Sequence, residues 1–355
     1  MPYTRNAVAV VTGGSAGVGR AVVSALLDRG HRVAVLARGQ RRLDDIARRY
    51  RDRVWTRSVD VSDGAALDAA GDAIVEEFGR PEIWVNSAML TSFSPFHAMG
   101  EEEFRRITDT TYHGTVNGCR TALRIVRRGN VVNVGSGLAY ASVPFQSAYC
   151  GAKHAVEGFT QALRIELART GRPLTVSMVQ LPAINTPQFD WARNRMARHP
   201  QPVPPIFQPE VAAEAVLRAI DTDAREVLVG GPVLKLMAGN MLLPDLVERQ
   251  LARSGVEAQQ ANRPDDDASD NLMHPVEDYP AVAHGGFDDR ARGQGLIVDG
   301  DVARKVAVTA GAALLLLAGA AIGRATAGGS RPPRRRLAAP AIIHRRGAPP
   351  MRRPG

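Results

Sequence analysis

The chain has 355 residues, of which 45% are hydrophobic, so it can bury a large core. Its net charge of +9 arises at the C-terminal end, where nine arginines lie at or beyond Arg324 and no acidic residue follows Asp301. Without those nine of the 45 basic residues, the remaining basic residues balance the 36 acidic ones, so the rest of the chain is neutral. This balance argues against a nucleic-acid-binding protein. Cys119 and Cys150 form no disulfide framework or metal-ligand pattern, and favour reduced thiols in a cytoplasmic protein.

Residues 6–231 alternate short apolar runs with longer amphipathic stretches, the pattern of a parallel sheet with crossover helices. Strands are predicted at Ala7–Thr12, Arg32–Arg38, Val54–Asp60, Ile83–Ser87, Asn130–Ser136, Leu174–Gln180 and Glu226–Val229. Helices are predicted near 17–29, 40–49, 63–78, 101–127, 147–170 and 209–221. The expected fold is therefore α/β, a Rossmann-type doubly wound parallel sheet of about seven strands, in a domain spanning 1–255.

The pattern changes after the last predicted strand. An apolar helix is expected over 232–253, with a break at Pro244. Residues 256–300 are rich in Asp, Gly and Pro, and are expected to form an extended or partly disordered linker. The chain then ends in an apolar helix (301–324) and a basic disordered tail (325–355).

The uncharged stretch 306–322 is a candidate transmembrane helix or membrane anchor. As a helix it would span about 26 Å, slightly less than a hydrocarbon core of roughly 30 Å. The basic tail and a nucleotide-binding domain would both face the cytoplasm, which conflicts with a simple span. A re-entrant or surface-lying helix at the inner face of the membrane, or packing against residues 234–247, would resolve that conflict.

A glycine-rich loop, Thr-Gly-Gly-Ser-Ala-Gly-Val-Gly, joins the first predicted strand to the first helix. Its glycines let the backbone turn tightly and approach a pyrophosphate at the helix N-terminus. A turn without a ligand is the alternative, but the position between strand and helix favours a dinucleotide. The predicted contacts are Gly13, Ser15, Gly17, Val18 and Gly19.

Arg38 ends the second predicted strand, where an acidic residue would bind the ribose hydroxyls of NAD. A guanidinium matches a 2′-phosphate, so Arg38 predicts NADP (NADPH) as cofactor. The alternative is a solvated arginine at a helix start. Asp60 ends the third strand and is expected either to accept a hydrogen bond from the adenine amino group or to serve as a turn or N-cap residue.

Tyr149 and Lys153 stand four residues apart, on one face of a predicted helix. A free tyrosine titrates about three pH units too high for proton transfer at neutral pH, and a neighbouring cation lowers that value. Ser136 ends the preceding strand, where open α/β sheets bind ligands, and its hydroxyl can hydrogen-bond a substrate oxygen.

With these motifs in this order, the chain resembles the short-chain dehydrogenase/reductase family over residues 6–231. The glycine loop resembles the cofactor fingerprint, and Ser136, Tyr149 and Lys153 match the catalytic serine, tyrosine and lysine. The resemblance implies further cofactor contacts at Asn86, Tyr149, Lys153, Pro182 and Thr186.

Three departures accompany the resemblance. Ser87 and Met89 replace the second asparagine and the glycine of the Asn-Asn-Ala-Gly stretch, and Ala183 replaces a glycine after the proline. The helix asparagine that supports a proton-relay water appears as Thr111, three residues before Gly114. Threonine can still hold a water through its hydroxyl or its carbonyl, so Thr111 remains a candidate catalytic residue.

The predicted function is hydride transfer between NADP(H) and an alcohol or carbonyl substrate, in a homo-oligomer as the resemblance implies. Aromatics on a proline-stiffened loop, 185–208, suggest an apolar substrate; ordinary packing of that loop is the alternative. A second hypothesis is a catalytically weak NADP-binding protein whose C-terminal extension recruits a membrane or partner. Nucleic acid is the least supported partner, because the arginine tail lacks interleaved aromatics.

Overall fold

The structure is a computed structural model, and it describes residues 6–265 and 270–327. The chain divides into two units, 1–304 and 305–355. The first unit is built around one large sheet and carries every residue of the predicted catalytic site.

The central sheet has eight strands in the order β14-β11-β7-β6-β4-β1-β2-β3. These strands are β1 (Val8–Thr12), β2 (Arg32–Ala37), β3 (Val54–Ser58), β4 (Pro81–Asn86), β6 (Gly129–Ser136), β7 (Leu174–Leu181), β11 (Glu226–Val229) and β14 (Ile297–Asp299). All pairings are parallel except that of β14 with β11, so the predicted doubly wound parallel sheet is confirmed. The chain proceeds outward from β1 to β2 and β3 on one side, and from β4 to β6, β7 and β11 on the other. A crevice for a ligand is therefore expected at the carboxyl ends of β1 and β4.

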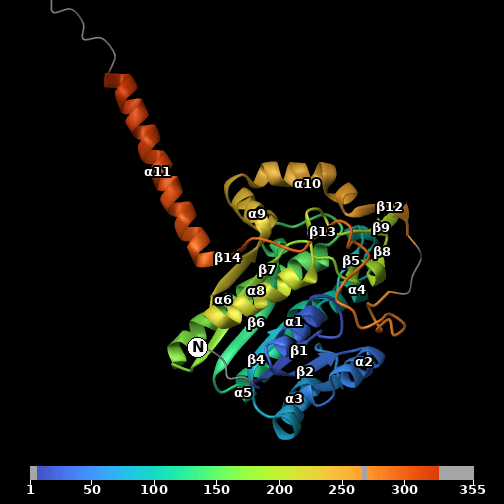
Figure 1. The fold of residues 1–355 in the computed structure, drawn as a ribbon. Coiled ribbons are helices and arrows are strands. Elements are labelled where there is room, and N and C mark those ends of the chain that lie inside the picture. Colours follow the sequence, from blue (N-terminus) through green and yellow to red (C-terminus); the bar gives the residue numbers. More distant parts are fainter. Residues whose placement is uncertain (1–5, 266–269, 328–355) are drawn as a thin grey trace, which may run out of the picture. The chain divides into compact units, whose positions relative to one another are not determined.

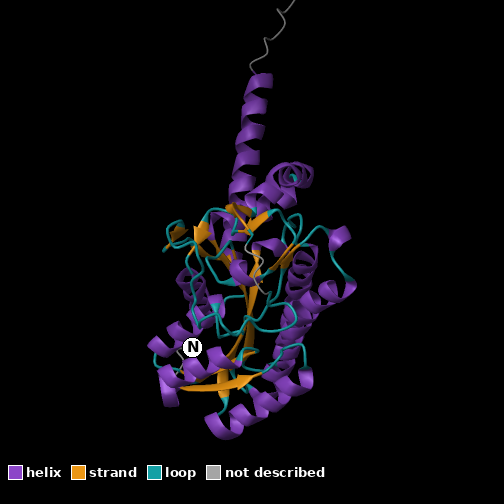
Figure 2. Ribbon diagram, turned by 90° about the vertical axis from the view of Figure 1, so that its right-hand side faces the viewer, coloured by secondary structure: helices purple, strands orange, loops and turns teal. Residues whose placement is uncertain are grey.

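Helices cover both faces of the sheet (Figures 1 and 2). One layer contains α1 (Gly17–Asp28), α2 (Gln40–Tyr50) and α8 (Pro209–Thr222), and the other contains α3 (Gly64–Ala73), α5 (Gly114–Ile125) and α6 (Ser147–Thr170). Alternation along β1 feeds both cores: Ala9 and Val11 pack in the first, Val8 and Val10 in the second. Burial on both faces is why the strands are almost continuously apolar.

The predicted helix 101–127 is interrupted. It consists of α4 (Glu101–Thr108), a π-helical turn (Asp109–His113) and α5, while α3 also runs into a π-helical turn (Ile74–Phe78).

Pro244 begins a new helix as expected, since α9 (Gly230–Leu242) is followed by α10 (Pro244–Ala258). The shorter elements are β5 (Ser92–Phe93), α7 (Gln188–Trp191), β8 (Arg193–Asn194), β9 (Arg198–Pro200), β10 (Ile206–Phe207), β12 (Gln260–Pro264) and β13 (Ala291–Arg292).

The segment 256–300 is expected from the sequence to form an extended or partly disordered linker; its described part consists mainly of turns and irregular loops, with three short strands. Within its described part, β12 pairs with β9, β13 pairs with β10, and β14 adds an antiparallel edge strand to the central sheet. The compact unit therefore continues to Arg304 instead of ending at residue 255. The polar composition suggested a linker, but the backbone N–H and C=O groups of these three strands pair with strands that are distant in the sequence.

The predicted C-terminal apolar helix forms as α11 (Gly300–Ala327). Among the helices of residues 6–265 and 270–327, none is long and apolar enough to cross a membrane, so the predicted transmembrane helix is wrong. The uncharged stretch 306–322 would span about 26 Å as a helix, less than a hydrocarbon core of roughly 30 Å. Of the predicted basic tail, 325–355, all but the first three residues lie outside the described part of the chain.

Candidate active site

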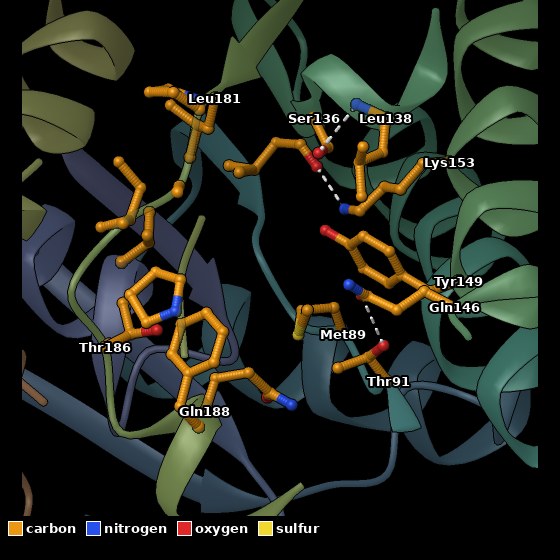
Figure 3. A pocket seen from close by; sticks show the side chains of 18 of the residues that line it. Met89, Thr91, Ser136, Leu138, Gln146, Tyr149, Lys153, Leu181, Thr186 and Gln188 are labelled. Atoms are coloured by element: carbon orange, nitrogen blue, oxygen red, sulfur yellow. Dashed lines mark hydrogen bonds between the residues drawn. The ribbon is translucent and has the colours of Figure 1, made fainter. Parts of the chain in front are cut away.

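A cavity of about 860 Å³ lies at the carboxyl ends of the parallel strands, which is a volume typical of small-molecule and cofactor sites. Its walls come from the loop between β1 and α1, the ends of β2, β4, β6 and β7, and helix α6. Figure 3 shows Ser136, Tyr149 and Lys153 along one wall, with Leu181, Thr186 and Gln188 opposite. Most of the predicted catalytic and cofactor residues therefore line one cavity, whereas Thr111 and Asn86 do not.

The glycine loop leaves space that side chains would fill. Gly13 has a φ of +69°, and a Cβ there would lie 2.7 Å from the Ala88 Cα, while a Cβ on Gly19 would lie 2.3 Å from the Gly13 carbonyl oxygen. Such a bare backbone at a helix N-terminus fits the pyrophosphate of a dinucleotide. The predicted contacts on the loop all line the cavity: Gly13, Ser15, Gly17, Val18 and Gly19.

The three candidate catalytic side chains converge on the cavity. Ser136 is the last residue of β6, and its Oγ accepts a hydrogen bond from the Leu138 N–H at 3.1 Å. Tyr149 and Lys153 lie one turn apart on α6, with the Lys153 Nζ 5.6 Å from the centre of the Tyr149 ring. The ammonium donates to the Val134 carbonyl at 2.8 Å, which holds it beside the strand end that carries Ser136.

Burial determines the protonation states of Tyr149 and Lys153. It raises the pKa of Tyr149, an effect that the Ser136 hydroxyl opposes, so the phenol is protonated at neutral pH and available as a proton donor. Burial also lowers the pKa of Lys153 to about 8, so the side chain remains mainly an ammonium at neutral pH. A proton donor, a hydroxyl and a cation thus share one buried wall.

Thr111 does not line the cavity. Its hydroxyl donates to the Leu90 carbonyl and accepts from the Leu90 N–H, both at 3.0 Å, and its carbonyl accepts from the Thr115 hydroxyl at 2.9 Å. The groups expected to hold a relay water therefore already have protein partners. Thr111 positions the loop after β4, and its neighbour Thr110 is the residue of this π-helical turn that reaches the cavity.

Arg38 and Asp60 both line the cavity. The Arg38 guanidinium donates to the backbone carbonyls of residues 271–273, and burial together with nearby Arg106 lowers its pKa to about 10. Asp60 pairs with Arg106 and accepts from the Ser62 N–H and hydroxyl at 3.0 and 2.7 Å. Burial would raise the pKa of Asp60, but these partners hold it below its usual value. The turn role expected for Asp60 is thus present.

Asn86 is not brought to the cavity, although Pro182 and Thr186 are. Its amide donates to the Asn133 side-chain oxygen at 2.9 Å, and its oxygen accepts from the Trp84 indole at 2.8 Å. Asn86 therefore belongs to a buried network that joins β4 and β6.

Several cavity residues were missed from the sequence. Gln146, one helical turn before Tyr149, accepts a hydrogen bond from the Thr91 hydroxyl, and spacing alone would have identified it as a neighbour of the tyrosine. The Thr110 hydroxyl and the Gln188 amide nitrogen are buried and have no hydrogen-bond partner among the described residues. No local pattern distinguishes these two from ordinary polar residues.

The loop expected to cover the substrate does contribute to the cavity. Three aromatic residues of this loop, Phe189, Trp191 and Phe207, all line it. Trp191 and Phe207 are also buried, so packing on the domain and lining the cavity are not exclusive. Leu236 of α9 and Leu251 of α10 add apolar surface that the sequence did not assign to the site.

Comparison with known proteins agrees with this arrangement. The family model described as short chain dehydrogenase matches residues 7–196. An uncharacterized oxidoreductase of Bacillus subtilis, YxnA, is 27% identical over 279 residues, which cover 76% of this chain and 78% of the relative. The 2-(R)-hydroxypropyl-CoM dehydrogenase of Xanthobacter autotrophicus is 31% identical over 235 residues, covering 62% of this chain and 93% of the relative.

Solved structures show the same fold. A short-chain dehydrogenase from Streptomyces avermitilis has a TM-score of 0.59 and 29% identity, and the match covers 70% of this chain and 97% of that chain. A short chain dehydrogenase/reductase from Burkholderia phymatum, in complex with NAD, has a TM-score of 0.61 at 22% identity, with the same coverage. At that identity the second match supports the fold alone.

Proposed function

Because the chain belongs to the short-chain dehydrogenase/reductase family and is an oxidoreductase, we propose that it transfers a hydride between NADP(H) and an alcohol or carbonyl substrate. The observation that carries this proposal is the convergence of Ser136, Tyr149 and Lys153 on the cavity that also contains the bare glycine loop. A bound nicotinamide would supply or accept the hydride.

In the reducing direction, Tyr149 donates its proton to the carbonyl oxygen of the substrate. Its raised pKa keeps the phenol protonated until that step, and the Lys153 ammonium stabilises the phenolate that forms. The Ser136 hydroxyl donates to the same substrate oxygen as negative charge develops on it. In the oxidising direction the phenolate takes the proton from the alcohol.

Arg38 supports NADP(H) as the nucleotide. It directly follows β2 and lines the cavity, and a guanidinium matches a 2′-phosphate better than a ribose hydroxyl. The aromatic and aliphatic side chains of Phe189, Leu236 and Leu251 support an apolar substrate, because desolvating an apolar group against them is favourable.

The full chain can test this proposal through nicotinamide fluorescence and a panel of apolar ketones. Tyr149→Phe should reduce ketone-dependent NADPH oxidation by at least about a hundredfold, because general acid catalysis is lost, while NADPH still binds. Tyr112→Phe is the matched control, since Tyr112 lies outside the cavity, and it should leave turnover unchanged. Full turnover by Tyr149→Phe would refute the role of the tyrosine, and no nucleotide binding by the wild type would refute the function.

A second candidate function is a nucleotide-binding protein with weak turnover. The observation that favours it is the engagement of Thr111 by Leu90 and Thr115, which leaves its hydroxyl and carbonyl less free to hold a relay water. Tight NADPH binding without turnover on either alcohols or ketones would support this candidate over the enzyme.

A further inference from the structure

Residues 270–279, here called the strap, lie against the start of helix α2. The Arg38 guanidinium donates to the carbonyls of residues 271–273, and the Arg42 guanidinium donates to those of Val276 and Tyr279. Arg38, which the sequence assigns to a nucleotide phosphate, and its neighbour Arg42 are therefore both in contact with the chain itself.

The strap also supplies a carboxylate to the N-terminus of α2. The two oxygens of Glu277 accept hydrogen bonds from the backbone N–H groups of Gln40 and Arg41, at 3.0 and 3.1 Å, across 237 and 236 residues of sequence. The N-cap of α2 is Gly39, which has no side chain to satisfy these donors. Glu277 thus occupies a place where a helix start favours an anion.

The surroundings of Glu277 contain more positive than negative charge. Arg38 is near enough to Asp60, Arg42 and Arg106 to interact with them, Arg42 interacts with Glu277, and Asp60 is paired with Arg106. Asp278 pairs with Arg41, which leaves the Glu277 carboxylate beside the Arg42 guanidinium and the start of α2. Arg42 is only 6% exposed, lines the cavity, and has a buried Nε without a hydrogen-bond partner in the part of the chain that the structure describes. These donors suit a group with more charge and more oxygens than one carboxylate.

We propose that Glu277 occupies the position of the 2′-phosphate of NADP(H), and that NADP(H) binds by displacing it. The inference rests on the proposed nucleotide and adds a residue that sets its selectivity. Carboxylate and phosphate compete for the same N–H donors and repel each other, whereas the 2′-hydroxyl of NAD(H) carries no charge. Glu277 therefore lowers the affinity for NADP(H) and not that for NAD(H).

The strap can release Glu277 without unfolding. On one side Leu272 is fully buried among Leu90, Ile107 and Ala148, and on the other the Tyr279 hydroxyl donates to Asp190 at 2.7 Å. Glu277 stands in the turn between these anchors and is half-buried. Its side chain can leave the helix start while both anchors stay packed.

The test compares NADPH and NADH binding to the full chain by nicotinamide fluorescence at fixed ionic strength. Glu277→Gln removes the charge and keeps the shape, and should tighten NADPH binding by about tenfold while NADH changes by less than about twofold. Asp278→Asn is the matched control, because it removes the same charge from the same turn at a side chain that is 89% exposed. It should change neither affinity by more than about twofold. Unfolding temperatures of both variants check that each remains folded.

Selective tightening of NADPH by Glu277→Gln alone supports the inference. Unchanged or weaker NADPH binding, or equal tightening of NADPH and NADH, overturns it, and so does the same selective effect in Asp278→Asn. Failure of the proposed function is distinct: the wild type would then bind neither nucleotide, or would show no turnover sensitive to Tyr149→Phe.

Discussion

Replacing Lys153 with methionine should stabilise the nucleotide-free protein while abolishing turnover. Lys153 is 4% exposed, and burial lowers its pKa from 10.5 to about 8. At about 1.4 kcal/mol for each pH unit, keeping the ammonium in the native state at pH 7 costs roughly 3 kcal/mol. Methionine removes that cost but loses the hydrogen bond to the Val134 carbonyl, worth about 1 kcal/mol. The expected net gain at pH 7 is about 2 kcal/mol.

The gain should depend on pH in a definite direction. Below pH 8 Lys153 is protonated in both the native and the unfolded state, so the buried ammonium destabilises the wild type by its full amount. Between pH 8 and 10.5 the native state binds fewer protons than the unfolded state, so wild-type stability rises with pH. At pH 9.5 the wild type has recovered about 2 kcal/mol, and the two proteins should be about equally stable.

Urea denaturation followed by tryptophan fluorescence, at pH 7 and at pH 9.5, measures this difference. Lys235→Met is the control, because Lys235 is exposed on α9 and its replacement should give no such change with pH. If Lys153→Met is less stable than the wild type at pH 7, or if its advantage is the same at both pH values, the reasoning from burial is refuted.

Two further predictions concern the glycine loop and the buried network. Gly19→Ala should weaken NADPH binding at least about tenfold and lower the free energy of unfolding by about 1–3 kcal/mol, because its Cβ would meet the Gly13 oxygen at 2.3 Å. In the control Gly151→Ala the new Cβ meets nothing within 4 Å, so affinity should not change; wild-type affinity in Gly19→Ala would contradict the close approach. Asn86→Ala breaks the buried hydrogen bond to Asn133 and should cost about 1–3 kcal/mol of stability in urea titrations, with NADPH affinity within about twofold. A loss of NADPH affinity without a loss of stability would instead indicate that Asn86 contributes to cofactor binding.

The strands were predictable because their signal is local. A strand buried on both faces must be apolar at nearly every position, and all seven predicted strands have counterparts in the central sheet. The added edge strand β14 carries no such run: its three residues are half-buried and lie in a polar segment. Its place in the sheet depends on β11, which it contacts from about 70 residues away in the sequence.

The π-helical turn at Asp109–His113 illustrates how a local register change alters a site. The sequence predicts one continuous helix, in which Thr111 would be the residue to hold a water. With the wider π-helical turn, Thr110 lines the cavity instead, and the Thr111 hydroxyl forms hydrogen bonds with the Leu90 backbone. Helical periodicity does not reveal such a turn, because its flanking residues remain helical.

The sequence by itself determined the doubly wound sheet, the glycine loop and the Tyr149–Lys153 pair, because each depends on residues close together along the chain. Only the tertiary structure decided what those groups meet. Asn86 ends β4, yet its amide bonds Asn133 on the neighbouring strand, which holds its side chain in the core. Arg38 likewise meets a strap more than 230 residues away, and Glu277 of that strap lies at the helix start. Spacing and composition describe neighbours along the chain, whereas these contacts depend on backbone pairing and charge between segments that only folding brings together.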